Sequence, residues 1–237
     1  PGKIITEQDE NNNKSKEYML EVKEAPTYTN AEWEYFKELA FRWGNGQPKV
    51  FTPYKKPIRV LLSGEPTPEQ REHLNSRIAI AQELGYDVQY TINPDKSNLP
   101  AHLNVNSQEL PGIFPRADPA NLARASGIAS PEISISGEMI RCTIAVPKPQ
   151  PGDPAFYFLN TTSEEFFTCL TGLFFDGSTR YPESIFRYGR HQYLVNPLPN
   201  IDLRVMQLAG EKTLWNARTP EQARKYIRVV DSLPSTR

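Results

Sequence analysis

Apolar residues recur every three or four positions in five segments of the chain, which is the spacing of one buried helix face. Two of these segments begin with the same signal, Thr-Pro-Glu-Gln, at residues 67–70 and 219–222. In this signal the threonine is the N-cap, the proline is the first residue of the helix, and the glutamine side chain hydrogen-bonds to the backbone of the threonine. We therefore expect helices at residues 30–43 (capped by Asn30), 67–84, 200–209 and 219–230, and another that begins at Thr162 or Ser163 and includes Leu173.

Five other segments combine β-branched or aromatic residues with alternation of apolar and polar positions, which is typical of strands. The most regular of them places Ile140, Cys142, Ile144 and Val146 on one face. We expect loops at residues 108–131 and in the proline-rich stretch 147–154. The sequence thus predicts an α+β fold, with helices packed on a mixed sheet of about five strands: residues 58–62, 87–92, 102–107, 139–146 and 155–159.

The first part of the chain differs from the rest in composition. Residues 1–29 contain few large apolar side chains and many polar ones, so they bury too little surface to offset the entropy of ordering. We expect a flexible N-terminal tether there, a single α+β domain at residues 30–231 and a short C-terminal tail at 232–237. The net charge of −1 excludes a strongly basic surface that coats nucleic acid.

Common catalytic motifs are absent from the sequence: there is no glycine-rich phosphate loop, Cys-x-x-Cys pair or Gly-x-Ser-x-Gly turn. His73, His102 and His191 fall on a helix, a strand and a loop, without the short spacing of metal ligands. Glu164 and Glu165 point to different sides of their helix, and the macrodipole explains acidic residues in a first turn. We therefore expect no cofactor and no catalytic residue.

Basic and aromatic residues alternate after Phe186, a pattern found in platforms that bind single-stranded nucleic acid. An anionic envelope polymer or lipid head group could use the same pattern. Because the segment is one short loop in a nearly neutral chain, we expect its rings to pack on the core, its arginines to face solvent, and nucleic acid not to bind. As a candidate interaction loop it comprises Arg187, Tyr188, Arg190, His191 and Tyr193.

Several short motifs, spread over residues 38–230, resemble one known family. They include Arg141-Cys142, Glu164-Glu165, Thr171-Gly172-Leu173 and, as the most specific, Tyr181-Pro182-Glu183-Ser184-Ile185-Phe186. Together they resemble the DUF2927 family of proteobacterial lipoproteins, which has no established activity. The resemblance implies a periplasmic location, an N-terminal lipid anchor in the outer membrane, and other envelope proteins as partners. We expect a signal peptide that ends in a lipidated cysteine just upstream of Pro1.

The expected order of elements is helix, strand, helix, four strands and helix, which is also the order in zincin metallopeptidases. There the last helix carries His-Glu-x-x-His, often followed by x-x-Gly. Aligning that pattern on Gly172 puts the two metal-ligand positions at Glu165 and Cys169 and the general base at Phe166. Phenylalanine accepts no proton, so the sequence predicts a zincin-like fold with a degenerate site that holds no metal.

Cys142 and Cys169 are the two cysteines of the chain, and both lie on apolar faces of expected elements. An exported protein could join them in a disulfide that closes a loop of about 28 residues. Free cysteines are also common as small core residues. The sequence leaves both alternatives open.

Two functions are compatible with these patterns. The leading hypothesis is a non-catalytic binding or assembly component of the bacterial cell envelope. The alternative is a zincin-like, metal-dependent hydrolase whose atypical site uses Glu165, Cys169 or a histidine that folding brings close.

Overall fold

The computed structural model contains both helices and strands, so the mixed α and β class is confirmed. None of the helices in the part of the chain that it describes is long and apolar enough to cross a membrane. The residues described are 3–9, 14–20, 24–43, 45–54, 57–63, 66–91, 101–104, 127–146, 152, 154–175, 179–187 and 191–232.

The largest sheet has five strands in the order β5-β4-β6-β8-β7. β5, β4, β6 and β8 run parallel to one another, whereas β7 at the edge runs antiparallel to β8. β4 pairs with β5 on one side and with β6 on the other, and it buries Ile58, Val60, Leu61 and Leu62, whereas Arg59 is exposed. The strand bounds are β4 Ile58–Ser63, β5 Val88–Thr91, β6 Ala101–Asn104, β7 Ile128–Ile133 and β8 Met139–Ala145.

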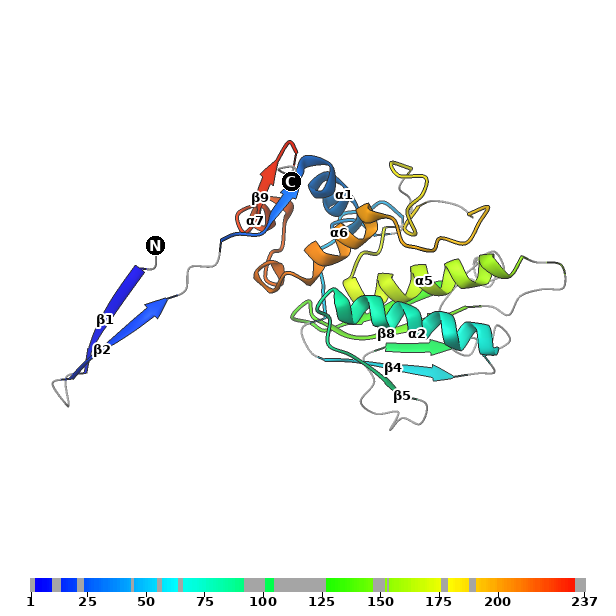
Figure 1. Cartoon of the computed structure of the whole chain (residues 1–237), viewed down its shortest axis with the longest axis horizontal. Coiled ribbons are helices and arrows are strands. Elements are labelled where there is room, and N and C mark those ends of the chain that lie inside the picture. Colours follow the sequence, from blue (N-terminus) through cyan, green and yellow to red (C-terminus); the bar gives the residue numbers. More distant parts are fainter. Residues whose placement is uncertain are drawn as a thin grey trace.

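Two long helices lie side by side across one face of this sheet (Figure 1). They are α2, Pro68–Glu83, and α5, Ala155–Thr171. α2 begins with the predicted capping box at Thr67, and Gly85 follows it with a φ of +88°. The left-handed conformation of Gly85 ends the helix because glycine adopts it without a steric penalty.

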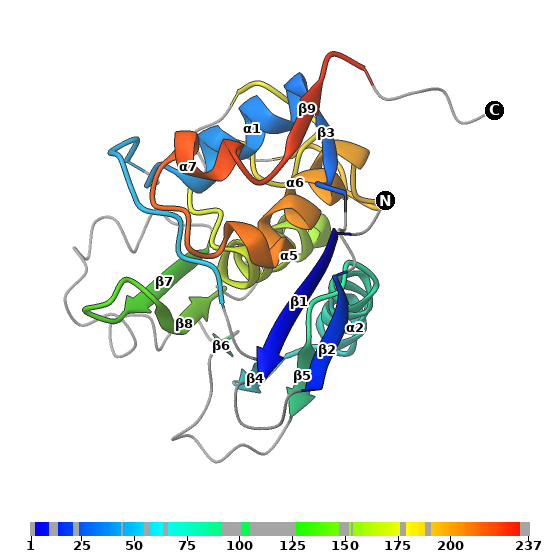
Figure 2. The same ribbon diagram turned by 90° about the vertical axis from the view of Figure 1, so that its left-hand side faces the viewer.

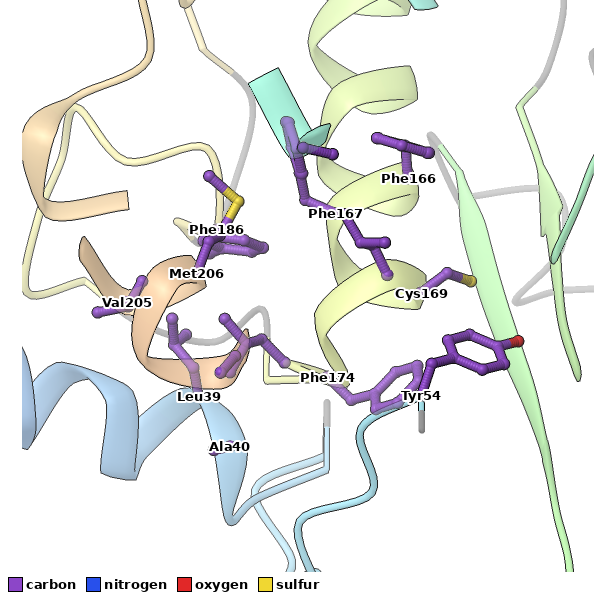
Figure 3. Close-up of a cluster of buried hydrophobic side chains, with 14 of the residues drawn as sticks. Leu39, Ala40, Tyr54, Phe166, Phe167, Cys169, Phe174, Phe186, Val205 and Met206 are labelled. Atoms are coloured by element: carbon purple, nitrogen blue, oxygen red, sulfur yellow. The ribbon is translucent and has the colours of Figure 1, made fainter. Parts of the chain in front are cut away.

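A second group of elements packs on the side of α5 that faces away from the sheet (Figures 1 and 2). Figure 3 shows the core at this junction, where Leu39, Phe186 and Met206 lie between α5 and the outer helices, while Cys169 points toward the sheet. The outer elements are β3 Thr27–Thr29, α1 Asn30–Ala40, α6 Asn200–Gly210, the 3-10 turn η3 Lys212–Leu214, α7 Pro220–Arg224 and β9 Arg228–Val230.

The segment expected as a flexible tether contains regular structure. β1, Lys3–Asp9, and β2, Lys14–Leu20, form an antiparallel hairpin that is drawn apart from the rest of the chain in Figure 1. β3 pairs in parallel with β9, and Tyr28 at its centre is buried. The structure thus pairs one strand of the expected tether with β9, and the expected boundary at residue 30 stays a prediction. The single domain and the tail at 232–237 stay predictions.

The largest error of the sequence analysis concerns α5. Residues 155–159 were expected as a strand and Thr162 or Ser163 as a cap, but the helix begins at Ala155. The hydroxyls of Thr161, Thr162 and Ser163 donate to the carbonyls four residues earlier, at 2.9, 2.9 and 3.1 Å. These bonds satisfy the hydroxyls inside the helix, so they do not act as caps.

Other expected boundaries also shift. Residues 128–131, expected as loop, belong to β7, and the last helix ends at Arg224 and is followed by β9. Thr29 caps α1 in place of Asn30, and this helix ends at Ala40. A register shift between β7 and β8 turns Ile140 outward, away from the buried face expected for it. Residues 105–107 of the expected third strand and residues 108–126 of the same expected loop lie outside the described residues.

Candidate functional site

The positions aligned with a zincin metal site lie on α5, at the centre of the molecule. Phe166 is 1% exposed, and its ring centroid lies 5.1 Å from that of Phe167. Figure 3 shows both side chains within the cluster of apolar residues. The position aligned with the general base is therefore occupied by a core aromatic ring.

Cys169 is joined to Cys142 in a disulfide that links α5 to β8. The two Cα atoms are 5.7 Å apart, and the cysteines are separated by 27 positions in sequence. A disulfide sulfur carries no thiolate charge, and metal ions bind the thiolate. In this oxidised state Cys169 therefore cannot serve as the zinc ligand that the alignment proposed.

The backbone conformation and close packing at Gly172 account for a glycine at this position, so a metal site is not needed to explain it. Gly172 ends α5 in the left-handed conformation, with a φ of +74°. A Cβ atom here would lie 2.8 Å from the carbonyl oxygen of Thr52, so only glycine allows the 51–54 segment to approach this closely. Its own carbonyl oxygen accepts a hydrogen bond from Lys49 Nζ.

Glu165, the remaining aligned position, is half-buried on the side of α5 that faces the start of β7. A Cβ atom on Gly127 would lie 2.9 Å from Oε1 of Glu165 and would also meet the methyl group of Thr161. The backbone that enters β7 thus packs directly against this carboxylate.

The three histidines do not converge on these positions in the described structure. His73 lies on α2 and contacts Ser163, whereas His191 lies in the segment after Phe186. The side chain of His102, on β6, is outside the described part. Among the described residues, no group of three or more His, Cys, Asp or Glu side chains is arranged to hold a metal ion.

The candidate interaction loop is only partly exposed. His191 is 5% exposed, and neither ring nitrogen has a hydrogen-bond partner among the described residues. Burial and the charge of Arg187 lower the pKa of His191, so the neutral ring is favoured. Arg187 is half-buried and donates to the carbonyl oxygen of Pro182 at 3.0 Å, whereas Tyr193 is exposed. Tyr188 and Arg190 lie outside the described residues.

A buried polar cluster links α2 to α5. The hydroxyl of Ser163 lies 2.6 Å from His73 Nε2 and accepts a hydrogen bond from Arg77 Nε at 2.9 Å. Arg77 also donates to the carbonyl oxygen of Val195 at 3.0 Å. Burial and the charge of Arg77 lower the pKa of His73 to about 4. Because Ser163 is fully buried, a substrate has no access to this serine–histidine pair, which instead joins the two helices.

A second buried cluster surrounds Asp202 on α6. Its carboxylate accepts hydrogen bonds from the hydroxyl of Ser184 and from the backbone N–H of Ile185, the latter at 2.7 Å. The phenol of Tyr35, on α1, donates to the Ser184 hydroxyl at 2.6 Å. Burial raises the pKa of Asp202 to about 7 against the effect of these hydrogen bonds. The cluster fixes the 184–186 turn between α1 and α6.

A cleft of about 720 Å³ lies beside α1 and is lined in part by Lys49, which forms a third buried polar cluster with its neighbours. Lys49 Nζ lies 4.7 Å from the ring centroid of Phe174 and 5.6 Å from that of Trp43. Burial lowers the pKa of Lys49 to about 7. The ring faces and the carbonyl of Gly172, at the negative end of α5, stabilise its charged form.

These three clusters were not predicted from the sequence, for different reasons. Asp202 occupies the apolar stripe of its helix, with Val205 and Met206, and a charged residue in that stripe was a usable signal. Ser163 was interpreted as a cap. Lys49 lies in an expected loop, and the pattern of residues around it does not indicate that its side chain is buried.

No protein-family model and no curated protein matches this sequence. The resemblance to the DUF2927 family therefore stays a prediction that rests on the short motifs alone.

Proposed function

We propose that this protein is a non-catalytic binding or assembly component of the bacterial cell envelope. In this proposal it is periplasmic, attached to the outer membrane through an N-terminal lipid anchor, and associated with other envelope proteins. It is built on a zincin-like core whose metal site has degenerated. The motifs around Tyr181–Phe186 support the family and, through it, the location.

The order of the described elements supports the zincin-like core. From α1 to α5 it is helix, strand, helix, four strands and helix, in which β7 replaces the strand expected at residues 155–159. α5 follows β8, the last strand of the five-stranded sheet, and packs on that sheet, which is the place that a metal-binding helix would occupy.

The observation that carries the non-catalytic role is the disulfide between Cys169 and Cys142. The bond removes the thiolate of Cys169, which is one of the two aligned ligand positions. The position aligned with the general base is occupied by Phe166, whose ring is buried. A disulfide also suits an oxidising compartment such as the periplasm, whereas cytosolic thiols are kept reduced. The bond thus supports the location as well as the absence of catalysis.

Fractionation of the native bacterium with palmitate labelling tests the location. We expect the labelled protein in the outer-membrane fraction. An unlabelled protein in the cytosol would contradict the proposal.

Elemental analysis of the purified protein tests the alternative of a metal-dependent hydrolase. We expect no stoichiometric zinc. Zinc at one equivalent, lost in Glu165→Gln and retained in Glu164→Gln, would favour the hydrolase instead.

A further inference from the structure

The cleft beside α1 is separate from the degenerate metal positions and has the size of a small-molecule site. It lies between α1, the segment that follows α1 and the start of α7, where Arg218, Thr219 and Pro220 line it. α1 and α7 are neighbours in both views of the molecule (Figures 1 and 2). Its apolar lining is formed by Phe41, Pro48, Val50 and Pro220.

Both carboxylates that line the cleft are already paired. Glu34 forms an ion pair with Lys37, one helical turn away, at 2.7 Å. Glu38 forms an ion pair with Arg180 at 3.3 Å. These two pairs leave the charge of the other cations in the cleft uncompensated.

Three further cations line the cleft: Arg42, Lys49 and Arg218. None of them forms an ion pair with an acidic side chain of the described structure. Arg42 lies 5.8 Å from the ring centroid of Phe175, and Arg218 donates to the carbonyl oxygen of Ser136 at 3.0 Å. Guanidinium groups present several donors in a plane, which suits carboxylates and phosphates.

The buried side chain of Lys49 is the strongest indication that the cleft binds an anion. It is 7% exposed, and one carbonyl oxygen, that of Gly172, is its described hydrogen-bond acceptor. An ammonium group has three donors, and a buried positive charge is costly unless a negative charge or further acceptors compensate it. An anion in the cleft would supply that compensation.

We propose that this cleft binds a small organic anion, a carboxylate or a phosphate ester, through Arg42, Arg218 and Lys49. The apolar lining contacts the carbon skeleton of the ligand. This inference rests on the proposed binding role and names the class of ligand, but it does not depend on the location in the envelope.

Calorimetric titration of the full chain at low salt tests the site, with malonate and glycerol 2-phosphate as separate probes. We expect saturable binding of at least one probe, and the tighter one identifies the head group. Arg42→Gln and Arg218→Gln should each weaken binding about tenfold or more, as expected when a charged hydrogen bond is lost. Arg71→Gln removes an exposed arginine of α2 that does not line the cleft, and it should leave the affinity within about twofold.

Proton exchange provides a second measurement, which separates a specific site from diffuse attraction. An anion near Lys49 favours its ammonium form, so binding at pH 8 should take up protons. Titrations in two buffers with different ionisation enthalpies measure this uptake. It should disappear in Lys49→Met and persist in Lys37→Met.

The inference is overturned if neither probe binds saturably in the millimolar range, or if Arg71→Gln weakens binding as much as the cleft variants do. Either result would leave the envelope location untouched, because fractionation measures that independently.

Discussion

At the scale of single residues, buried polar side chains connect segments that are far apart in sequence. Ser163 joins α5 to α2, Asp202 holds the turn at Ser184, and Lys49 attaches the 41–50 segment to the end of α5. A buried donor or acceptor that loses its partner costs about 1–3 kcal/mol. Each of these side chains therefore favours one arrangement of the segments over any other.

The disulfide should contribute strongly to stability. In the chain-entropy model, closing a loop of about 28 residues stabilises the folded state by about 3–4 kcal/mol. We expect the double variant Cys142→Ala/Cys169→Ala to lose about that much in free energy of unfolding, measured by guanidinium titration. Thiol counting under denaturing, non-reducing conditions should find no titratable thiol in the native protein, and two thiols would contradict the bond.

Asp202 should make stability depend on pH below neutrality. Its pKa rises on folding from 3.8 to about 7, so between these values the folded state binds more protons than the unfolded state. The stability that protonation of Asp202 contributes is fully present below pH 4 and is lost as the pH rises through 7. Asp202→Asn should therefore gain stability relative to the native protein as the pH rises from 4 to 7.5. Thermal unfolding measures the difference, and the exposed Asp87→Asn should show no such trend.

At the scale of elements, the best-defined helix start is that of α2. Gln70 N–H donates to the Thr67 hydroxyl at 3.3 Å, and the Gln70 side chain accepts from the Thr67 N–H at 2.6 Å. Thr67→Ala should cost about 1 kcal/mol of stability because it removes the cap. Thr67→Ser keeps the hydroxyl and should change little. Urea titration compares the three proteins, and equal losses in both variants would exclude the capping role.

α2 could be predicted because its signals are local: the Thr-Pro-Glu-Gln start and Gly85 lie within the segment itself. α5 has no such signals. Its N-cap is Pro154, without a side-chain hydrogen bond, and three aromatic residues, Phe156, Tyr157 and Phe158, follow Ala155 in its first turn. Aromatic residues favour strands in isolation, and burial against both the sheet and α6 overrides that preference.

Short strands at the edges of the sheets could not be predicted for a related reason. β7 is a strand because it pairs with β8, and β9 because it pairs with β3, about 200 positions away. Pairing of this kind depends on tertiary contacts, which periodicity does not record. The same holds for the cleft, which combines Lys49 with residues near positions 37 and 218.

At the scale of the whole molecule, groups with shifted pKa act in different ranges of pH. Asp202 lowers stability as the pH rises from about 4 to 7, while His73, whose pKa falls from 6.5 to about 4, raises it over much of the same range. These two effects oppose each other. Above pH 7 the main shifted group is Lys49, until the buried tyrosines reach their ordinary range near pH 10.

Lys49 should therefore move the pH of greatest stability into the alkaline range. Its pKa falls on folding from 10.5 to about 7, so between these values the unfolded state binds more protons and stability rises with pH. Above pH 10 the trend reverses, because burial raises the pKa of Tyr35 and Tyr86 and only the unfolded chain ionises these phenols. We expect a maximum near pH 9–10, above the usual range of about 5–8.

Lys49→Met should flatten the rise between pH 7 and 10, whereas Lys37→Met, which changes an exposed lysine of the same cleft, should preserve it. Guanidinium titrations at several pH values measure the profile, and a native protein that is most stable near pH 6 would show that the ring faces and the Gly172 carbonyl keep Lys49 charged.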